Sequence, residues 1–185
     1  GFVVSPTTAG EIIAFNSGDG LEAWSDALTS NDPAATATNI GSVAGRPVIE
    51  GGQVFAISNA GRMAAFALQS GDRQWTRDIS GSQTPWVAGD HVFVIINGKT
   101  LMALSRRTGA VRWSKDLPGK IWAGPVLGGG RLLAVSSDGQ LASISAQTGE
   151  VLNTTKVGDA FYIAPVIANG TVYLLSDDAE LIALR

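Results

Sequence analysis

The chain has 185 residues, of which 45% are hydrophobic and 16% charged, so it is long enough for one domain and too apolar to be disordered. Its 13 basic and 16 acidic residues give a formal charge of −3, which argues against a nucleic-acid partner or an anionic membrane surface. With no cysteine, and His91 as the single histidine, a disulfide, a thiolate metal site and a multi-histidine metal site are all excluded.

Short apolar or β-branched runs separated by glycine-containing turns predict strands along the whole chain. In chain order, we expect a first unit over 1–30, with strands near 2–4, 11–15 and 21–25 but without the innermost strand. A long polar loop follows over 26–44. Three complete four-stranded units and a last unit that stops after its third strand come next, at 45–80, 83–118, 122–158 and 162–185. We expect all of them to form a single domain over 1–185.

A proline marks the start of the first strand in each later unit. The prolines are Pro47, Pro85, Pro125 and Pro165, at intervals of 38, 40 and 40 residues. A proline is tolerated there because its missing N–H costs least at the first residue of a strand. About 40 residues per four-stranded unit is the size of a β-propeller blade. The predicted fold is therefore all-β, a partial propeller of about four to five four-stranded blades.

A second landmark lies between the third and fourth strands of a unit. It combines a small residue in the third strand, a glycine in the turn and a tryptophan in the fourth strand: Ala14, Gly20, Trp24, Ala65, Gly71, Trp75, Ala103, Gly109, Trp113 and Gly149. Glycine supplies the positive φ of the turn, and tryptophan buries a large area. We expect these residues to dock neighbouring blades. Asn153 replaces the fourth tryptophan, so we expect a looser contact there.

The motif Ala-x-(Asp/Asn/Ser)-x-x-(Thr/Ser)-Gly-x-x-x-Trp resembles the docking motif of propellers of the pyrroloquinoline-quinone (PQQ) type. Four further segments resemble the C-terminal half of the BamB family, and the resemblance covers essentially the whole chain: Gly45-Arg46-Pro47-Val48-Ile49, Gly61-Arg62-Met63, Thr84–Asp90 and Ala168–Leu175. It implies a PQQ-like propeller of eight blades, of which this chain would supply about four to five.

The same resemblance implies a function. Members of the family are non-catalytic scaffold lipoproteins of the β-barrel assembly machinery, at the periplasmic face of the outer membrane. They bind the POTRA domains of BamA and assist the folding and insertion of outer-membrane protein clients. The chain itself begins without a signal peptide or lipidated cysteine. We therefore expect any lipid anchor to belong to the full-length protein.

Candidate partner-binding residues lie just before the first strand of the second blade. In relatives this region includes acidic side chains implicated in contacting BamA, and the matching positions here are Ser42 and Ala44, so those acids are missing. Arg46 still matches the family pattern. The preceding loop, 26–44, is read either as a polar insertion or as a partner-contact loop.

The remaining candidates favour structural roles. Trp86 and Trp122 lie outside the repeated tryptophan position and fit core packing or, alternatively, an exposed aromatic surface. His91 fits a solvated strand start, and Asp177-Asp178 fits a hairpin turn better than a weak cation site. We expect no catalytic residue, no metal site and no cofactor.

Two alternative functions stay open. A fragment of a PQQ-dependent dehydrogenase would share the docking motif, but the resemblance to those enzymes implies a vicinal disulfide, which a chain without cysteine cannot form. A propeller that binds another periplasmic or surface protein, or a polysaccharide, is the second alternative. Whatever the function, the partial propeller is expected to form an open arc whose two end blades expose apolar faces, which predicts either self-association through them or a truncation artefact.

Overall fold

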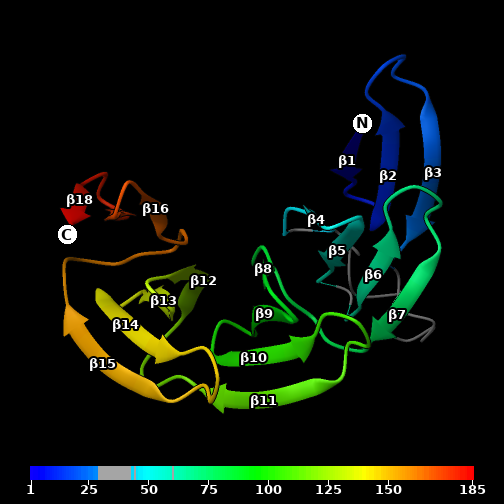
Figure 1. Cartoon of the computed structure of the whole chain (residues 1–185). Coiled ribbons are helices and arrows are strands. Elements are labelled where there is room, and N and C mark those ends of the chain that lie inside the picture. The colour runs from blue at the N-terminus through cyan, green and yellow to red at the C-terminus, as the bar shows by residue number, and fades with distance from the viewer. Residues whose placement is uncertain (29–42, 44, 60) are drawn as a thin grey trace.

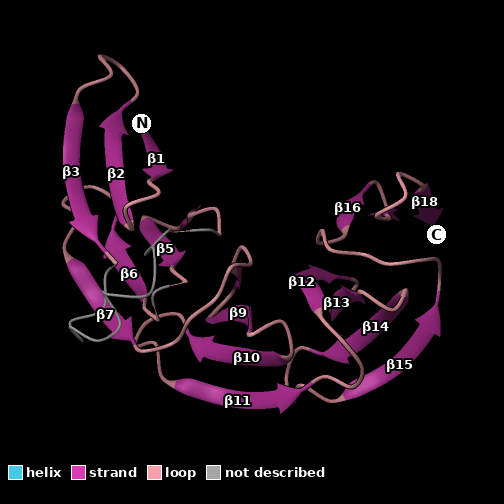
Figure 2. Ribbon diagram, turned by 180° about the vertical axis from the view of Figure 1, so that it is seen from behind, coloured by secondary structure: helices cyan, strands magenta, loops and turns pink. Residues whose placement is uncertain are grey.

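The computed structural model describes residues 1–28, 43, 45–59 and 61–185, and these residues form strands and turns without any helix. Within this part of the chain the strands make five antiparallel sheets, each built from consecutive strands, which confirms the predicted all-β class. The sheets follow one another around an open arc, with the two termini at its two ends (Figures 1 and 2). The described residues include no helix long and apolar enough to cross a membrane.

Each sheet is one blade of the propeller. The first blade contains β1 (Phe2–Pro6), β2 (Glu11–Asn16) and β3 (Glu22–Ala27). The second contains β4 (Val48–Glu50), β5 (Gln53–Ile57), β6 (Met63–Ala67) and β7 (Arg73–Arg77). The third contains β8 (Trp86–Ala88), β9 (His91–Ile96), β10 (Thr100–Ser105) and β11 (Val111–Asp116). The fourth contains β12 (Trp122–Gly128), β13 (Arg131–Ser136), β14 (Gln140–Ser145) and β15 (Val151–Lys156). The fifth contains β16 (Val166–Ala168), β17 (Thr171–Leu175) and β18 (Leu181–Leu184).

Two boundaries differ from the sequence-based expectation. The strand β3 runs to Ala27, so the start of the range 26–44 is strand and not loop. The strand β12 begins at Trp122 and passes through Pro125, whereas the other innermost strands begin after their prolines. A shift in the pairing with β13 between Ala123 and Val126 accommodates this, because it leaves Gly124 and Pro125 outside the ladder.

The hydrophobic core consists of separate clusters, each lying between two neighbouring blades. Alternate residues of the two middle strands of a blade point to opposite neighbours. Phe55 and Ile57 of β5 thus pack with Val92 and Val94 of the third blade, while Val54 of the same strand packs toward the first blade. We call each such contact between neighbouring blades a joint.

The repeated tryptophans lie at the joints. The Nε1–H groups of Trp24, Trp75 and Trp113 donate to backbone carbonyl oxygens of the next blade, those of Leu68, Arg106 and Ala146, at 2.8, 2.8 and 3.2 Å. Each ring also lies over the turn glycine of that blade, Gly71, Gly109 or Gly149. A Cβ atom added there would come within 2.7, 2.6 or 2.5 Å of the ring. Glycine is required at these turns both for this close approach and for φ values of 66–76°.

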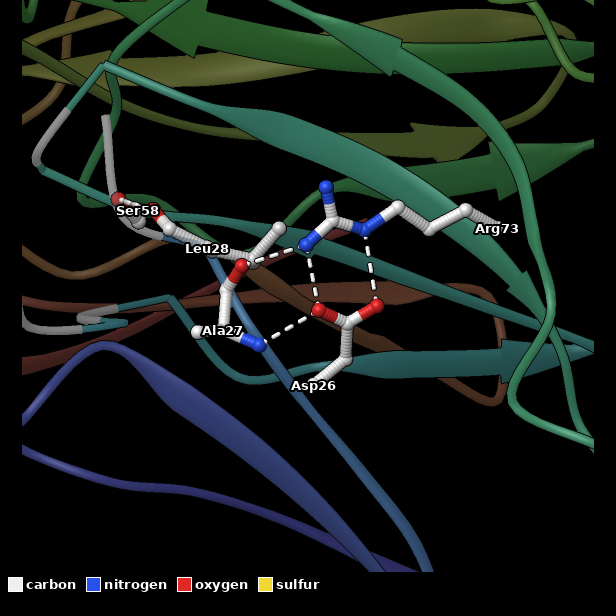
Figure 3. Close-up of polar contacts among 5 residues, drawn as sticks. All are labelled: Asp26, Ala27, Leu28, Ser58 and Arg73. Atoms are coloured by element: carbon white, nitrogen blue, oxygen red, sulfur yellow. Dashed lines mark hydrogen bonds and ion pairs between the residues drawn. The ribbon is translucent and has the colours of Figure 1, made fainter. Parts of the chain in front are cut away.

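Arginine side chains add polar contacts that the repeat does not reveal. At the first joint the Arg73 guanidinium makes a bidentate contact with the Asp26 carboxylate, in which Nε donates to Oδ2 at 2.8 Å (Figure 3). The Nη2 group of Arg73 also donates to the Ala27 carbonyl at 2.6 Å. Ser58 donates to the Leu28 carbonyl beside it at 3.0 Å. At the second joint Arg106 donates to the Gln53 side chain at 2.8 Å. These contacts fix the relative placement of neighbouring sheets.

The joint between the fourth and fifth blades lacks a tryptophan. Asn153 is exposed, and its amide donates to Thr155 of its own strand at 3.2 Å. Apolar packing forms this joint, with Phe161 and Leu174 buried against Ala123 and Val135.

Candidate partner-binding groove

A groove of about 400 Å³ lies where the innermost strands of four blades begin. The segments that precede β4, β8 and β16 meet here with Pro125 and Val126 of β12, because these four strands occupy the same position in successive blades. The lining residues are Arg46, Ser82, Gln83, Thr84, Trp86, Pro125, Val126, Tyr162, Ile163, Ala164, Pro165 and Val166.

Close backbone packing holds Arg46 at one end of the groove. A Cβ atom on the preceding residue, Gly45, would lie 2.6 Å from the Gln83 carbonyl oxygen, so only glycine permits this approach between the second and third blades. The Arg46 N–H then donates to the Thr84 hydroxyl at 3.2 Å. Val43, two residues before Gly45, is buried in the cluster at the first joint and anchors the segment.

The Arg46 guanidinium is exposed and makes no hydrogen bond or ion pair with any described residue. It is therefore available to a carboxylate or carbonyl group of a binding partner, and its planar set of donors suits a two-pronged contact with a carboxylate. Ser42 and Ala44, the other two predicted contact positions, lie outside the described residues.

The other end of the groove is apolar and open to solvent. Tyr162, Ile163 and Val166 are 51%, 59% and 60% exposed, which is unusual for side chains of this size in one place. Trp86 is half-buried on the groove wall and also packs against the cluster of the third joint. An apolar surface beside the exposed Arg46 guanidinium can bind a protein segment that carries apolar and acidic side chains.

The structure separates the two tryptophans that lie outside the repeat. Trp122 is completely buried, and its Nε1–H donates to the Pro118 carbonyl at 2.7 Å, so it belongs to the core. Trp86 reaches the groove. Tyr162 and Ile163 were not singled out from the sequence, although they stand three and two residues before Pro165, as Ser82 and Gln83 do before Pro85 in the third blade.

The remaining polar candidates form no second site. His91 is half-buried and stacks on Phe93, with ring centroids 5.7 Å apart. Ser176 donates to the Asp178 carboxylate within the turn before β18, so this acidic pair lies in a hairpin turn. Among the described residues, no three or more His, Cys, Asp or Glu side chains lie close enough together to hold a metal ion.

Comparisons with known proteins agree with this architecture. The family model described as "Outer membrane protein assembly factor BamB" matches residues 1–115 and 99–185. The crystal structure of BamB from Moraxella catarrhalis superposes with a TM-score of 0.88 at 20% identity, over 98% of this chain and 55% of that one. No curated protein sequence matches the chain.

Two other solved structures share the fold. The computationally designed Ika8 protein gives a TM-score of 0.75 at 15% identity, over 98% of this chain and 54% of that one. A quinohemoprotein alcohol dehydrogenase from Pseudomonas putida HK5 gives 0.67 at 14% identity, over 85% of this chain and 33% of that one. The chain thus spans about half the length of the first two structures and about a third of the length of the third. At these sequence identities the structural similarity shows the fold alone.

Proposed function

Because the chain belongs to the outer membrane protein assembly factor BamB family, we propose that it is a non-catalytic scaffold of outer-membrane protein assembly. In this proposal it binds the POTRA domains of BamA and assists the folding and insertion of outer-membrane proteins. Its place is the periplasmic face of the outer membrane, with the lipid anchor carried by the full-length protein.

The observation that carries the proposal is the groove between Arg46 and Tyr162. Its exposed apolar side chains lie at one end, and the exposed Arg46 guanidinium, which pairs with none of the described residues, gives the other end a positive charge. Protein-binding surfaces combine these features: apolar or aromatic residues contribute most of the affinity, while a charged residue at the rim selects the partner and its orientation.

Calorimetric titration with purified BamA POTRA domains tests both the partner and the groove. We expect the unaltered chain to bind. We expect Arg46→Glu and Tyr162→Ala each to weaken binding by at least about fivefold, or about 1 kcal/mol, since each removes one of the two recognition features. Arg112→Glu is the matched control, because Arg112 is also exposed but lies on the outermost strand β11.

The two parts of the proposal fail separately. If the unaltered chain does not bind POTRA domains, the partner is wrong. If it binds and the two groove variants bind as well as the Arg112→Glu control, the partner stands and the groove is wrong. A circular dichroism melt of each variant, compared with that of the unaltered chain, separates a loss of binding from a loss of folding.

A further inference from the structure

A second pocket adjoins the groove, between the second and third blades. It measures about 320 Å³, and its lining includes Ser80, Asn97 and Ile121. Ser82 and Gln83 line both this pocket and the groove, so the two cavities meet along the linker that joins β7 to β8. We call this second cavity the polar pocket.

The polar pocket lies beside a linker that is short and carries small side chains. Pro85 follows the tryptophan of the second blade by 10 positions, whereas Pro125 follows the tryptophan of the third blade by 12. The shorter linker contains Ser80-Gly81-Ser82, while the longer one contains the large side chain of Trp122. A short linker with small side chains leaves room for a ligand next to the main chain.

Main-chain hydrogen bonds hold the walls of the polar pocket in place. Asn97 and Gly98 form the tight turn between β9 and β10, and both have the positive φ of a type I′ turn, 52° and 63°. The Gly98 carbonyl accepts a hydrogen bond from the Trp122 N–H at 2.7 Å, and the Gly81 N–H donates to the Ser58 carbonyl at 3.2 Å. A pocket that is formed before binding loses less conformational entropy when a ligand enters it.

The lining of the polar pocket offers hydrogen-bonding groups without charge. Among the described residues that line it, none is charged or aromatic. Four of its side chains make no hydrogen bond with any described residue: Ser80, Ser82, Gln83 and Asn97. Side-chain amides and hydroxyls both donate and accept. The main chain of a polypeptide offers the same pair of groups, one N–H and one C=O per residue, so it suits this pocket better than a charged side chain does.

We propose that the polar pocket binds main-chain groups of the same partner segment that occupies the groove, an inference that rests on the proposed function. The segment runs along the linker, with an acidic side chain at Arg46 and its peptide groups at Gln83 and Asn97. Ile121, which is 55% exposed, adds an apolar contact. The charge of Arg46 selects the segment and the polar pocket fixes its path, because main-chain contacts add affinity without reading side chains.

Removal of the Asn97 side chain tests this contact. Asn97→Gly deletes the amide and keeps the turn, since glycine readily adopts a positive φ. In calorimetric titration with purified BamA POTRA domains we expect this variant to bind about threefold more weakly, and Ser80→Ala about twofold, as for the loss of one hydrogen bond. Asn169→Gly is the matched control, because Asn169 has a φ of 51° in the exposed turn between β16 and β17 and lines neither cavity.

Salt distinguishes the polar pocket from the charged end of the groove. The loss of affinity caused by Arg46→Glu should shrink as NaCl rises from about 0.1 M to about 1 M, because the Debye length falls from about 10 Å to about 3 Å. The loss caused by Asn97→Gly should stay the same, since an amide and a peptide group carry no net charge. A circular dichroism melt of each variant separates a loss of binding from a loss of folding.

The outcomes separate this contact from the proposed function. If the unaltered chain does not bind POTRA domains, both are wrong. If it binds, and Asn97→Gly binds as tightly as the Asn169→Gly control, the main-chain contact alone is wrong. A loss for Asn97→Gly that shrinks with salt in parallel with the loss for Arg46→Glu would also contradict an uncharged contact.

Discussion

A tryptophan and a glycine from neighbouring blades form the residue-scale unit of this propeller. The glycine permits both the left-handed turn and the contact with the indole ring, and the indole N–H satisfies a carbonyl group of the turn. The pair works in one direction along the chain, since each ring docks on the blade that follows. Gly20 has the same turn conformation, with φ of 74°, but no atom lies within 4 Å of its Cβ position.

Gly20 therefore provides a control for the docking role of Gly109. Gly20→Ala should lower the free energy of unfolding by about 1–2 kcal/mol, the cost of a left-handed backbone for alanine. Gly109→Ala should lower the free energy of unfolding by about 1–3 kcal/mol more than Gly20→Ala does, because the added methyl group would clash with the Trp75 ring. Urea unfolding monitored by tryptophan fluorescence measures both values, and equal losses would contradict the docking role.

Trp122 and Trp86 should respond differently to truncation. Trp122→Ala should destabilise the chain by about 3–5 kcal/mol, because it opens a cavity in the third joint and leaves the Pro118 carbonyl without its donor. Trp86→Ala should cost less, since Trp86 is only half-buried, and should weaken POTRA binding as well. Thermal melts and calorimetric titrations of the two variants distinguish the roles. The reverse order of stabilities would contradict the assignment.

At the scale of the element, each blade is a sheet whose outermost strand reaches toward the next blade. In four blades the pairing between the third and fourth strands shifts by one residue just after the small residue of the third strand, at Ala14, Ala65, Ala103 and Ser143. This bulge lies beside the tryptophan in the first three blades and increases the local twist. In the fourth blade the bulge is kept although Asn153 replaces the tryptophan.

The stability of the first joint should depend on the bidentate contact that the Arg73 guanidinium makes with the Asp26 carboxylate. A double-mutant cycle with Arg73→Leu and Asp26→Leu should give a coupling free energy of about 0.5–1 kcal/mol, modest because both side chains are partly exposed to solvent. Arg73→Lys should not restore it, since a single ammonium group cannot reach both carboxylate oxygens and the Ala27 carbonyl. Full recovery with lysine in chemical denaturation would show that charge alone matters.

At the scale of the whole molecule, the arc is a row of blades in which each sheet contacts only its neighbours. Such an arrangement lets stability vary along the chain, as in other repeat proteins. The last joint has neither a docked tryptophan nor an arginine contact among the described residues, and its cluster contains four buried residues where the second joint has nine.

Hydrogen exchange should reflect this gradient. The amides of β17 should exchange faster than those of β9 and β13, because the fifth blade can open without disturbing the others. Mass spectrometry of exchanged peptides measures the difference. Uniform protection across the three strands would mean that the arc opens as one unit.

The sequence by itself determined the repeat, and with it the all-β class, the blades and the family. A period of about 40 residues, a turn glycine and a strand tryptophan are local features that can be recognised without knowing where the blades lie. That Ser42 and Ala44 contact a partner stays a prediction. The same role for Arg46 rests on the family resemblance and on the place of this residue in the groove.

Only the tertiary structure decided which distant residues meet. Asp26 and Arg73 are 47 positions apart, and Arg46, Trp86 and Tyr162 come from three different blades to line one groove. Nothing in their local sequence marks these neighbours, because contact between blades depends on how successive sheets are rotated and packed.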